Sequence, residues 1–172
     1  MKKINLSWSD TQGLCIEICR QIQQSGWMPQ YVVGITRGGS TPAVLISQYL
    51  NVPCEMLKVS LRDDGETESN CWMAEDAYGY EKLAPKNILI VDDINDSGRT
   101  LQWIQDDWRS SCRPNDPVWD TIWGTTTRTA CLVNNHSSKF NIDYSGTSFN
   151  KLDEDVWWVF PWEDWWKNGR NA

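Results

Sequence analysis

Apolar residues near the start of the chain recur at a spacing typical of one helix face. They are Leu14, Cys15, Ile18, Cys19 and Ile22. Apolar positions three and four residues apart indicate an amphipathic α-helix. Ser9 and Gln12 precede this run with the spacing of a capping box, and Ser25-Gly26 provides a stop signal. The pattern therefore predicts a first helix that buries one face and ends at Ser25.

Short apolar runs alternate with helical patterns along the rest of the chain. We predict helices over residues 41–50 and 100–108, and strands over residues 31–35, 54–60, 87–91, 127–133 and 156–160. Strands separated by helices are typical of an α/β domain with a mostly parallel central sheet flanked by helices. The polar stretch 61–86 predicts a mobile excursion from this domain.

Length and charge narrow the class of protein. The chain has 172 residues, enough for one domain with a hydrophobic core and too few for two ordinary ones, so we expect residues 1–172 to form a single domain. There is no run of about 18 apolar residues and no secretory signal, which predicts a cytoplasmic protein with no membrane partner. A formal net charge of −7 argues against general affinity for nucleic acid.

The six cysteines are scattered along the chain without a C-x-x-C pair, and His136 is the only histidine. This spacing argues against a zinc site or a disulfide framework and favours buried free thiols.

The apolar run at residues 87–91 is followed directly by Asp92 and Asp93 and then by a polar turn. The turn consists of Asp96, Ser97, Gly98, Arg99 and Thr100. A glycine here lets backbone N–H groups converge on a phosphate at the N-terminus of the next helix, where hydroxyl groups and an arginine add donors. The acids cannot favour the same phosphate, so they would serve sugar hydroxyl groups or magnesium (Mg²⁺). The pattern predicts a site for a phosphorylated sugar.

Residues 91–100 resemble the phosphoribosyl pyrophosphate motif of type I phosphoribosyltransferases: an apolar strand, two acids, three variable residues and Ser/Thr-Gly-x-Thr. Two acids after a strand also occur in receiver domains, and a glycine turn can simply cap a helix, so this motif alone leaves that alternative open. The resemblance implies the type I phosphoribosyltransferase fold, in which a small C-terminal aromatic hood covers the base.

A second motif, residues 34–43, resembles the pyrophosphate loop of the same family, particularly its xanthine/guanine and hypoxanthine branch. It contains Thr36, Arg37, Gly38 and Gly39. Arg37 would pair with a diphosphate, and the glycines would allow close approach of the backbone. The resemblance also implies a strained or cis peptide bond between residues 36 and 38. An ordinary turn between strand and helix is the alternative.

The third motif, residues 157–163, is similar to the segment that covers the nucleobase in bacterial xanthine/guanine phosphoribosyltransferases. Trp157 or Trp158 would stack on the base, as flat aromatic rings do in other base sites. A hydrophobic edge strand would carry the same residues. The three motifs occur in the family's order, which strengthens the resemblance.

The resemblance implies an enzyme of nucleotide salvage that transfers the 5-phosphoribosyl group from phosphoribosyl pyrophosphate to a nucleobase, with a homo-oligomer as the expected assembly. Asp92 and Asp93 would hold the ribose and Mg²⁺, Arg37 would stabilise the leaving diphosphate, and Asp96 would be the general base. The alternative is a regulator related to the phosphoribosyltransferases that binds phosphoribosyl pyrophosphate or a nucleotide without turnover.

One departure from the family concerns the base. Counted back from Asp143-Tyr144, the lysine that contacts the purine 6-oxo group falls at Asn135. An asparagine can both donate and accept, whereas an ammonium group only donates. Asn135 therefore predicts a weaker preference for 6-oxopurines, unless neighbouring Lys139 reaches the site.

Overall fold

The computed structural model describes residues 1–59 and 70–168. The elements in chain order are β1 (Lys2–Asn5), α1 (Trp8–Ser25), β2 (Tyr31–Thr36), α2 (Ser40–Leu50), β3 (Cys54–Lys58), α3 (Cys71–Tyr78), η1 (Tyr80–Lys82), β4 (Ile88–Asn95), α4 (Arg99–Asp107), η2 (Trp108–Cys112), α5 (Trp119–Ile122), β5 (Thr127–Asn135), β6 (Tyr144–Phe149), β7 (Val156–Val159) and α6 (Trp165–Asn168).

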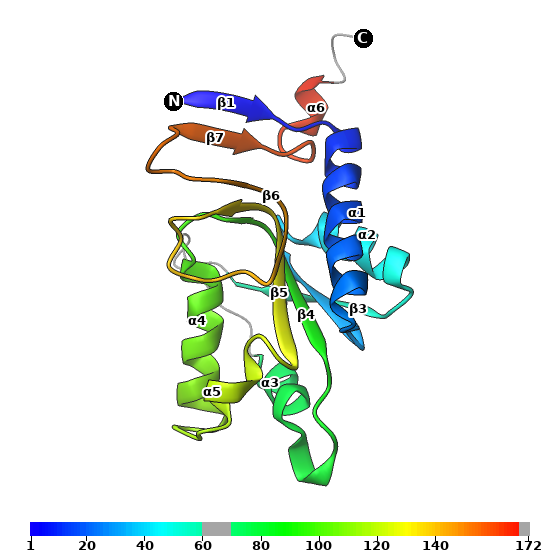
Figure 1. Ribbon diagram of the computed structural model, residues 1–172, viewed down its shortest axis with the longest axis vertical. Helices are drawn as coiled ribbons and strands as arrows, with labels where there is room; N and C mark the ends of the chain where they lie inside the picture. The colour runs from blue at the N-terminus through cyan, green and yellow to red at the C-terminus, as the bar shows by residue number, and fades with distance from the viewer. Residues whose placement is uncertain (60–69, 169–172) are drawn as a thin grey trace.

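The centre of the molecule is a five-stranded sheet in the order β3-β2-β4-β5-β6 (Figure 1). All four strand pairs in it are parallel. The fully buried run from Ile88 to Val91 places β4 in the middle of this sheet. Buried parallel strands read as continuous apolar runs, which is why the sequence predicts this strand so clearly. The predicted α/β fold with a mostly parallel sheet is confirmed.

Helices cover both faces of the sheet, and successive residues of each strand point to opposite faces. Val32 and Leu89 pack with α1 and α2 on one face, whereas Val33 and Ile90 pack with α3, α4 and Trp108 on the other. Figure 1 shows α1 and α2 on one side of the strands and α4 and α5 on the other. This three-layer arrangement leaves the carboxyl ends of the strands for the loops that carry the motifs.

A second, two-stranded sheet stands apart from the central one. Its strands are β1 and β7, paired in parallel with Trp157 opposite Lys3. The strand predicted at residues 156–160 therefore exists but joins the N-terminus rather than the central sheet. Neither β1 nor β6 was predicted, because their many polar residues leave no apolar run or clear alternation of apolar and polar residues.

Two of the boundaries that differ from the sequence predictions have a clear structural cause. The capping box of α1 is formed by Ser7 and Asp10, not by Ser9 and Gln12: the Asp10 N–H donates to Ser7 Oγ at 3.0 Å, and the Ser7 N–H donates to Asp10 Oδ2 at 2.7 Å. The strand predicted to end at residue 91 continues to Asn95, because Asp92, Ile94 and Asn95 still pair along β5.

The stretch 61–86 also differs from its prediction. Residues 61–69 lie outside the described part of the chain, whereas residues 70–86 contain α3 and η1. Cys71 of α3 and Cys112 of η2 form a disulfide, so the prediction of free thiols is wrong for this pair. Cys15, Cys19, Cys54 and Cys131 are free. None of the helices within the described ranges is long and apolar enough to span a membrane.

Candidate active site

Three loops meet at one edge of the central sheet. β2 ends at Thr36, β4 at Asn95 and β5 at Asn135, and these strands are parallel neighbours. In open α/β sheets, ligands bind in the crevice outside the carboxyl ends of the strands. The fold therefore brings the first two sequence motifs together at a place suited to a ligand.

The pyrophosphate loop, residues 36–39, connects β2 to α2. The peptide bond between Thr36 and Arg37 is cis, within the segment for which the family resemblance implies a strained or cis bond. A Cβ atom on Gly39 would lie 2.8 Å from the Ile35 carbonyl oxygen, so the loop backbone packs closely on the strand before it. The Arg37 side chain is exposed, which leaves its guanidinium accessible to an anionic ligand.

Gly38 connects this loop to the acids of the next strand. A Cβ atom at Gly38 would lie 2.7 Å from Asp93 Oδ1 and nearer still to Oδ2 of the same carboxylate. The carboxylate thus fills the space that a side chain at residue 38 would need. A diphosphate held by the loop would consequently lie beside Asp93.

Asp92 and Asp93 lie near the end of β4, and both are half-buried. The Asp93 N–H donates to Asp92 Oδ1 at 2.9 Å, and the Ile94 N–H donates to Asp93 Oδ1 at 2.8 Å. Burial raises the pKa of Asp92 well above its usual value, and the charge of Asp93 adds to this effect. A cation or sugar hydroxyl groups placed here would relieve the repulsion between the two carboxylates.

The same carboxylates suit Mg²⁺. This ion is commonly bound by one or two protein carboxylates together with substrate phosphates. Within residues 1–59 and 70–168, no cluster of three or more His, Cys, Asp or Glu side chains offers an all-protein metal site. The chemistry of Asp92 and Asp93 therefore fits a metal that arrives with a phosphorylated ligand.

The phosphate loop, residues 96–100, leads into α4. Gly98 has φ 83° and caps the helix, and a Cβ atom on it would lie 2.7 Å from Ser138 Oγ and from the Phe140 backbone nitrogen. Only glycine combines this conformation with so little space. Ser97 and Arg99 are exposed beside the first turn of α4, whose N–H groups can receive a phosphate.

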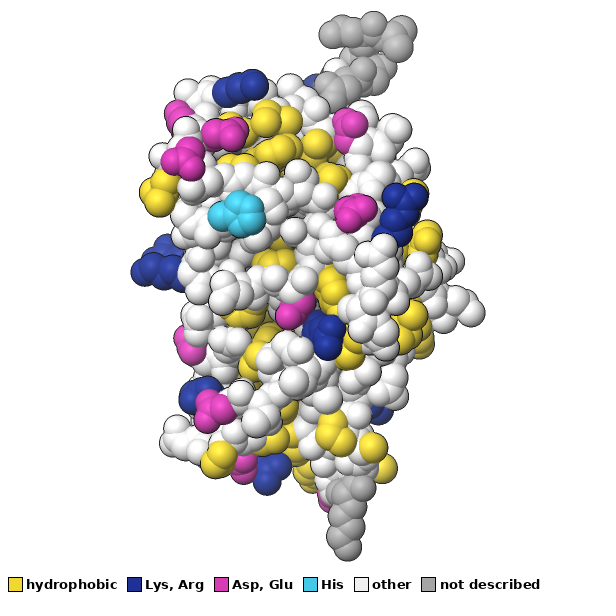
Figure 2. Space-filling model, viewed as in Figure 1, with side chains coloured by type: hydrophobic (Ala, Val, Ile, Leu, Met, Phe, Trp, Pro, Cys, Tyr) yellow, Lys and Arg dark blue, Asp and Glu magenta, His cyan; other side chains and the backbone are white. Residues whose placement is uncertain are grey.

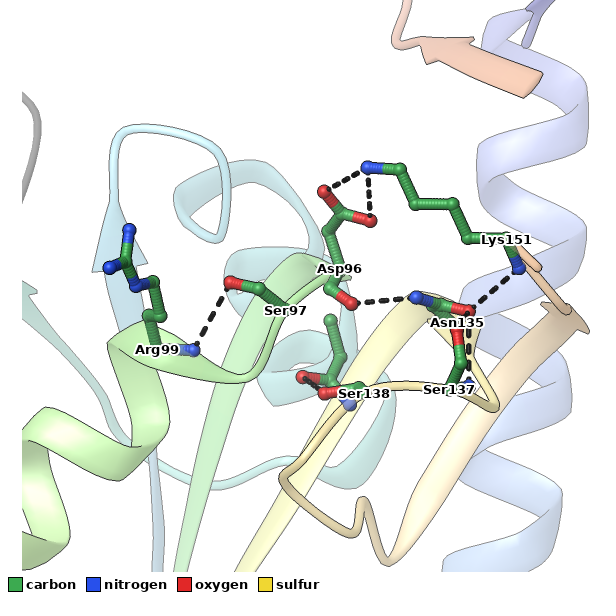
Figure 3. A network of polar contacts seen from close by, with 8 residues as sticks. Asp96, Ser97, Arg99, Asn135, Ser137, Ser138 and Lys151 are labelled. Carbon is green, nitrogen blue, oxygen red and sulfur yellow. Dashed lines mark hydrogen bonds and ion pairs between the residues drawn. The ribbon is translucent and has the colours of Figure 1, made fainter. Parts of the chain in front are cut away.

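Asp96 makes an ion pair that its sequence position does not suggest. Lys151 Nζ lies 2.9 Å from Asp96 Oδ1 and 2.7 Å from Oδ2, so both carboxylate oxygens accept from one ammonium group. Lys151 comes from the turn after β6. Figure 3 shows its side chain reaching over Asp96 from the side opposite Ser97 and Arg99.

Asn135 is buried beneath this ion pair rather than exposed at the edge of the sheet. Its Nδ2 donates to the Asp96 carbonyl oxygen at 2.8 Å, and its Oδ1 accepts from the Lys151 N–H at 3.0 Å (Figure 3). Oδ1 also accepts from the N–H and hydroxyl groups of Ser137. The predicted base contact by Asn135 remains a prediction. The hydrogen bonds that this side chain makes within the protein connect the turn after β4 to the turn after β6.

The aromatic hood, which we define as β1, β7 and residues 160–168, contains both tryptophans of the third motif. Trp157 is 46% exposed, whereas Trp158 packs on Phe149 with ring centroids 5.8 Å apart. Figure 2 shows hydrophobic side chains gathered over β7, while lysine and arginine side chains are scattered among acidic ones on the same face. Trp157 is the more exposed of the two rings, and which of them stacks on a base remains a prediction.

Two further charged residues interact with the predicted site residues and were missed by the sequence analysis. One is Lys151. The other is Glu163 in the hood, whose pKa is raised by burial and, to a smaller extent, by the charge of Asp93. Nothing in the sequence around Lys151 indicates which acid it pairs with. Glu163 ends the third motif, and that position was a weak signal for a role in the site.

The chain is similar to purine phosphoribosyltransferases of known sequence. The chain is 27% identical to a xanthine-guanine phosphoribosyltransferase of Cereibacter sphaeroides, over 94% of this chain and 87% of that protein. It is 20% identical to xanthine phosphoribosyltransferase 1 of Saccharomyces cerevisiae, over 94% and 90%.

Solved structures share the fold. A Helicobacter pylori xanthine-guanine-hypoxanthine phosphoribosyltransferase superimposes with a TM-score of 0.67, 19% identity and 99% coverage of each chain. A Pyrococcus horikoshii purine phosphoribosyltransferase superimposes with a TM-score of 0.64, 22% identity and 94% coverage of each chain.

The profile described as "Phosphoribosyl transferase domain" matches residues 7–165, a range that includes all three motifs and the strands that carry them. This match confirms the predicted resemblance and the prediction of an enzyme of this type. The chain belongs to the phosphoribosyl transferase domain family.

Proposed function

We propose that this chain catalyses Mg²⁺-dependent transfer of the 5-phosphoribosyl group from phosphoribosyl pyrophosphate to a purine base in nucleotide salvage. The products are a nucleoside monophosphate and pyrophosphate. The observation that carries the proposal is the contact between Gly38 and Asp93. Because of it, the loop suited to a diphosphate and the acids suited to ribose and metal adjoin each other.

The ligand is placed by three parts of the chain. The first turn of α4, with Ser97, Arg99 and Thr100, binds the 5′-phosphate through N–H groups, hydroxyl groups and charge. Asp92 and Asp93 accept hydrogen bonds from the ribose hydroxyl groups. Residues 36–39 then face the diphosphate on C1.

The reaction forms a bond from a ring nitrogen of the base to C1 while the bond from C1 to the diphosphate oxygen breaks. Arg37 stabilises the charge that develops on the leaving diphosphate, because its guanidinium can donate two parallel hydrogen bonds. Asp92 and Asp93 would hold Mg²⁺, which would neutralise further charge on the diphosphate when bound. Asp96 accepts the proton that the purine loses from the other nitrogen of its five-membered ring.

A purine is supported by the relatives and by the hood. The similar proteins are named for xanthine, guanine and hypoxanthine, and the exposed Trp157 offers a flat surface for a base.

The test is product formation. The purified protein is incubated with phosphoribosyl pyrophosphate, Mg²⁺ and a panel of nucleobases, and nucleoside monophosphates are detected by mass spectrometry. A purine monophosphate is the expected product, and the double variant Asp92→Asn, Asp93→Asn should form none and bind the sugar diphosphate weakly. Binding of phosphoribosyl pyrophosphate without product from any base would contradict the proposed activity and support a non-catalytic regulator instead.

A further inference from the structure

The Cys71–Cys112 disulfide lies at the end of the molecule away from the hood. α4 begins at Arg99 in the phosphate loop and continues without a break into η2, which ends at Cys112. The disulfide joins Cys112 to Cys71, the first residue of α3. In Figure 1, α3 and α5 lie at the end of α4 that points away from β1 and β7. The disulfide is therefore separate from the loops that form the candidate active site.

η2 is attached to the start of α3 at both of its ends. At the first residue of η2, Trp108 Nε1 donates to Asn70 Oδ1 at 2.9 Å, and the Trp108 ring is fully buried. At the last residue, Cys112 is bonded to Cys71. Asn70 and Cys71 are neighbours in sequence, so one short segment holds the whole turn. One attachment is a hydrogen bond inside the core, and the other is a covalent bond that a thiol can break.

Noncovalent contacts near Cys112 are weak. The Arg113 N–H donates to the Trp108 carbonyl oxygen at 3.4 Å, which is long for a hydrogen bond. The Arg113 guanidinium pairs with Asp116 at 2.7 Å and lies over the Tyr78 ring at 5.0 Å. Its side chain is 49% exposed, and ion pairs between partly exposed side chains contribute little to stability. The position of the end of η2 therefore depends mainly on the disulfide.

We propose that Cys71 and Cys112 form a reversible redox site, and that its reduction releases η2 for local unfolding while the rest of the fold stays in place. The reductant is a low-molecular-weight thiol. Its thiolate attacks one sulfur of the disulfide and forms a mixed disulfide, and a second thiol molecule displaces the protein sulfur from it. The products are two protein thiols and one small disulfide, so two electrons and two protons pass to the protein.

Both cysteines are accessible to such a reductant. Cys71 and Cys112 are half-buried, and the residues next to them, Trp72 and Ser111, are exposed. The rate of exchange with a thiol depends on this access. After reduction, the buried hydrogen bond at the start of η2 still holds the two segments together. The thiols therefore stay close enough for the bond to form again when an oxidised small thiol is present.

The buried cysteines are poor partners in this exchange. Cys15, Cys19 and Cys131 are buried, and burial raises the pKa of each thiol. Since exchange proceeds through the thiolate, these three cysteines should stay reduced. Cys54 is free and half-buried, which makes it a matched control, a cysteine of similar exposure outside the disulfide.

Reduction makes the peptide bond between Arg109 and Ser110 sensitive to proteases. This bond lies between the two attachment points of η2, Trp108 and Cys112, and the Arg109 side chain is 52% exposed. A protease cleaves a helical segment through its locally opened form. That form is rare while both ends of η2 are held, whereas release of Cys112 lets the turn unwind from that residue. The redox state of the pair thus sets how readily the chain is cut here.

One experiment follows the thiols. Wild-type protein is equilibrated with millimolar reduced or oxidised glutathione, free thiols are labelled with iodoacetamide, and the peptides are identified by mass spectrometry. Cys71 and Cys112 should be labelled together after reduced glutathione. After oxidised glutathione they should be unlabelled and joined to each other, and the change should repeat over several cycles. Labelling that does not differ between the two conditions overturns the reversible site.

A second experiment follows trypsin cleavage after Arg109, with cleavage after Arg20 as an internal reference. Arg20 is an exposed arginine within α1. In the double variant Cys71→Ser, Cys112→Ser, the rate of cleavage after Arg109 should rise about tenfold or more over that of the oxidised wild type, because the cross-link no longer limits opening. The rate after Arg20 should not change. Cys54→Ser should behave as the wild type does.

The outcomes are separable. An unchanged rate after Arg109 overturns the release of η2, and an equal rise at both arginines overturns its local character. If the double variant does not fold, wild-type protein that has been reduced with glutathione, capped with iodoacetamide and freed of both reagents gives the same comparison. None of these readouts uses catalysis, so the proposed function is tested independently.

Discussion

Replacement of Gly38 by alanine is expected to impair the active site while leaving the fold intact. The new Cβ atom would lie 2.7 Å from Asp93 Oδ1 and closer to the rest of the carboxylate, whereas real Cβ atoms essentially never come within 3.0 Å of such neighbours. Because the obstructing atoms form the end of a short side chain, the carboxylate can move aside. The acid would then be displaced from the position where it serves ribose and metal.

The magnitude follows from the size of the displacement. The carboxylate must shift by roughly 1 Å, a misplacement that can cost a reaction about 10²-fold in rate. We therefore expect kcat/KM for phosphoribosyl pyrophosphate to fall on the order of 10²-fold in Gly38→Ala. The unfolding temperature should stay within about 2–4 °C of wild type, equivalent to about 1 kcal/mol for a chain of this size.

Two other glycines provide the comparison. A Cβ atom on Gly39 would meet backbone oxygens of Val91 and Ile35, which cannot move aside, so Gly39→Ala should lower the free energy of unfolding by about 1–3 kcal/mol. Gly13 in α1 has open space around it, and Gly13→Ala should stabilise the helix by about 1 kcal/mol without changing activity. Initial rates and thermal unfolding of all three variants separate these effects. Wild-type kcat/KM in Gly38→Ala would refute the assignment of Asp93 to the site.

Three further predictions concern other parts of the protein. Asp96→Asn should reduce kcat on the order of 10²-fold with little change in phosphoribosyl pyrophosphate binding by calorimetry, and an unchanged kcat would remove Asp96 from proton transfer. Trp157→Ala should lower kcat/KM for the base about tenfold or more through lost stacking, whereas Trp158→Ala should mainly lower the unfolding temperature; the reverse pattern would exchange their roles. Burial raises the pKa of Cys15 to about 12 and of Cys19 to about 11, so neither should be alkylated at pH 8 in the folded protein; rapid labelling detected by mass spectrometry would contradict this.

Local patterns explain why much of the site could be predicted. Gly98 and the apolar strand before Asp92 reflect rules that act over a few residues: a left-handed turn needs glycine, and a buried parallel strand needs a continuous apolar run. The pyrophosphate loop also depends on a local requirement, because only glycines at residues 38 and 39 leave space for close approach of the backbone. These requirements are visible in the sequence because the residues that impose them are neighbours.

Other features depended on residues distant in sequence. Ser7 and Ser9 are both acceptable capping residues, and only the position at which the chain leaves β1 decides that Ser7 begins the helix. The disulfide joins Cys71 to Cys112 across 41 residues, because α3 and η2 pack on the same face of the sheet. Cysteine spacing contains no information about that packing.

The sequence by itself indicated the α/β class through the periodicity of its apolar residues. The three motifs indicated the family because they resemble its motifs. The tertiary structure alone decided which side chains meet beside the phosphate loop. Lys151 and Asp96 are paired only because β5 and β6 lie side by side and Asn135 joins the turns that follow β4 and β6. Their contact depends on the register of parallel strands, which no local pattern specifies. The same register placed Asn135 between the two turns, a role that its position in the sequence did not suggest.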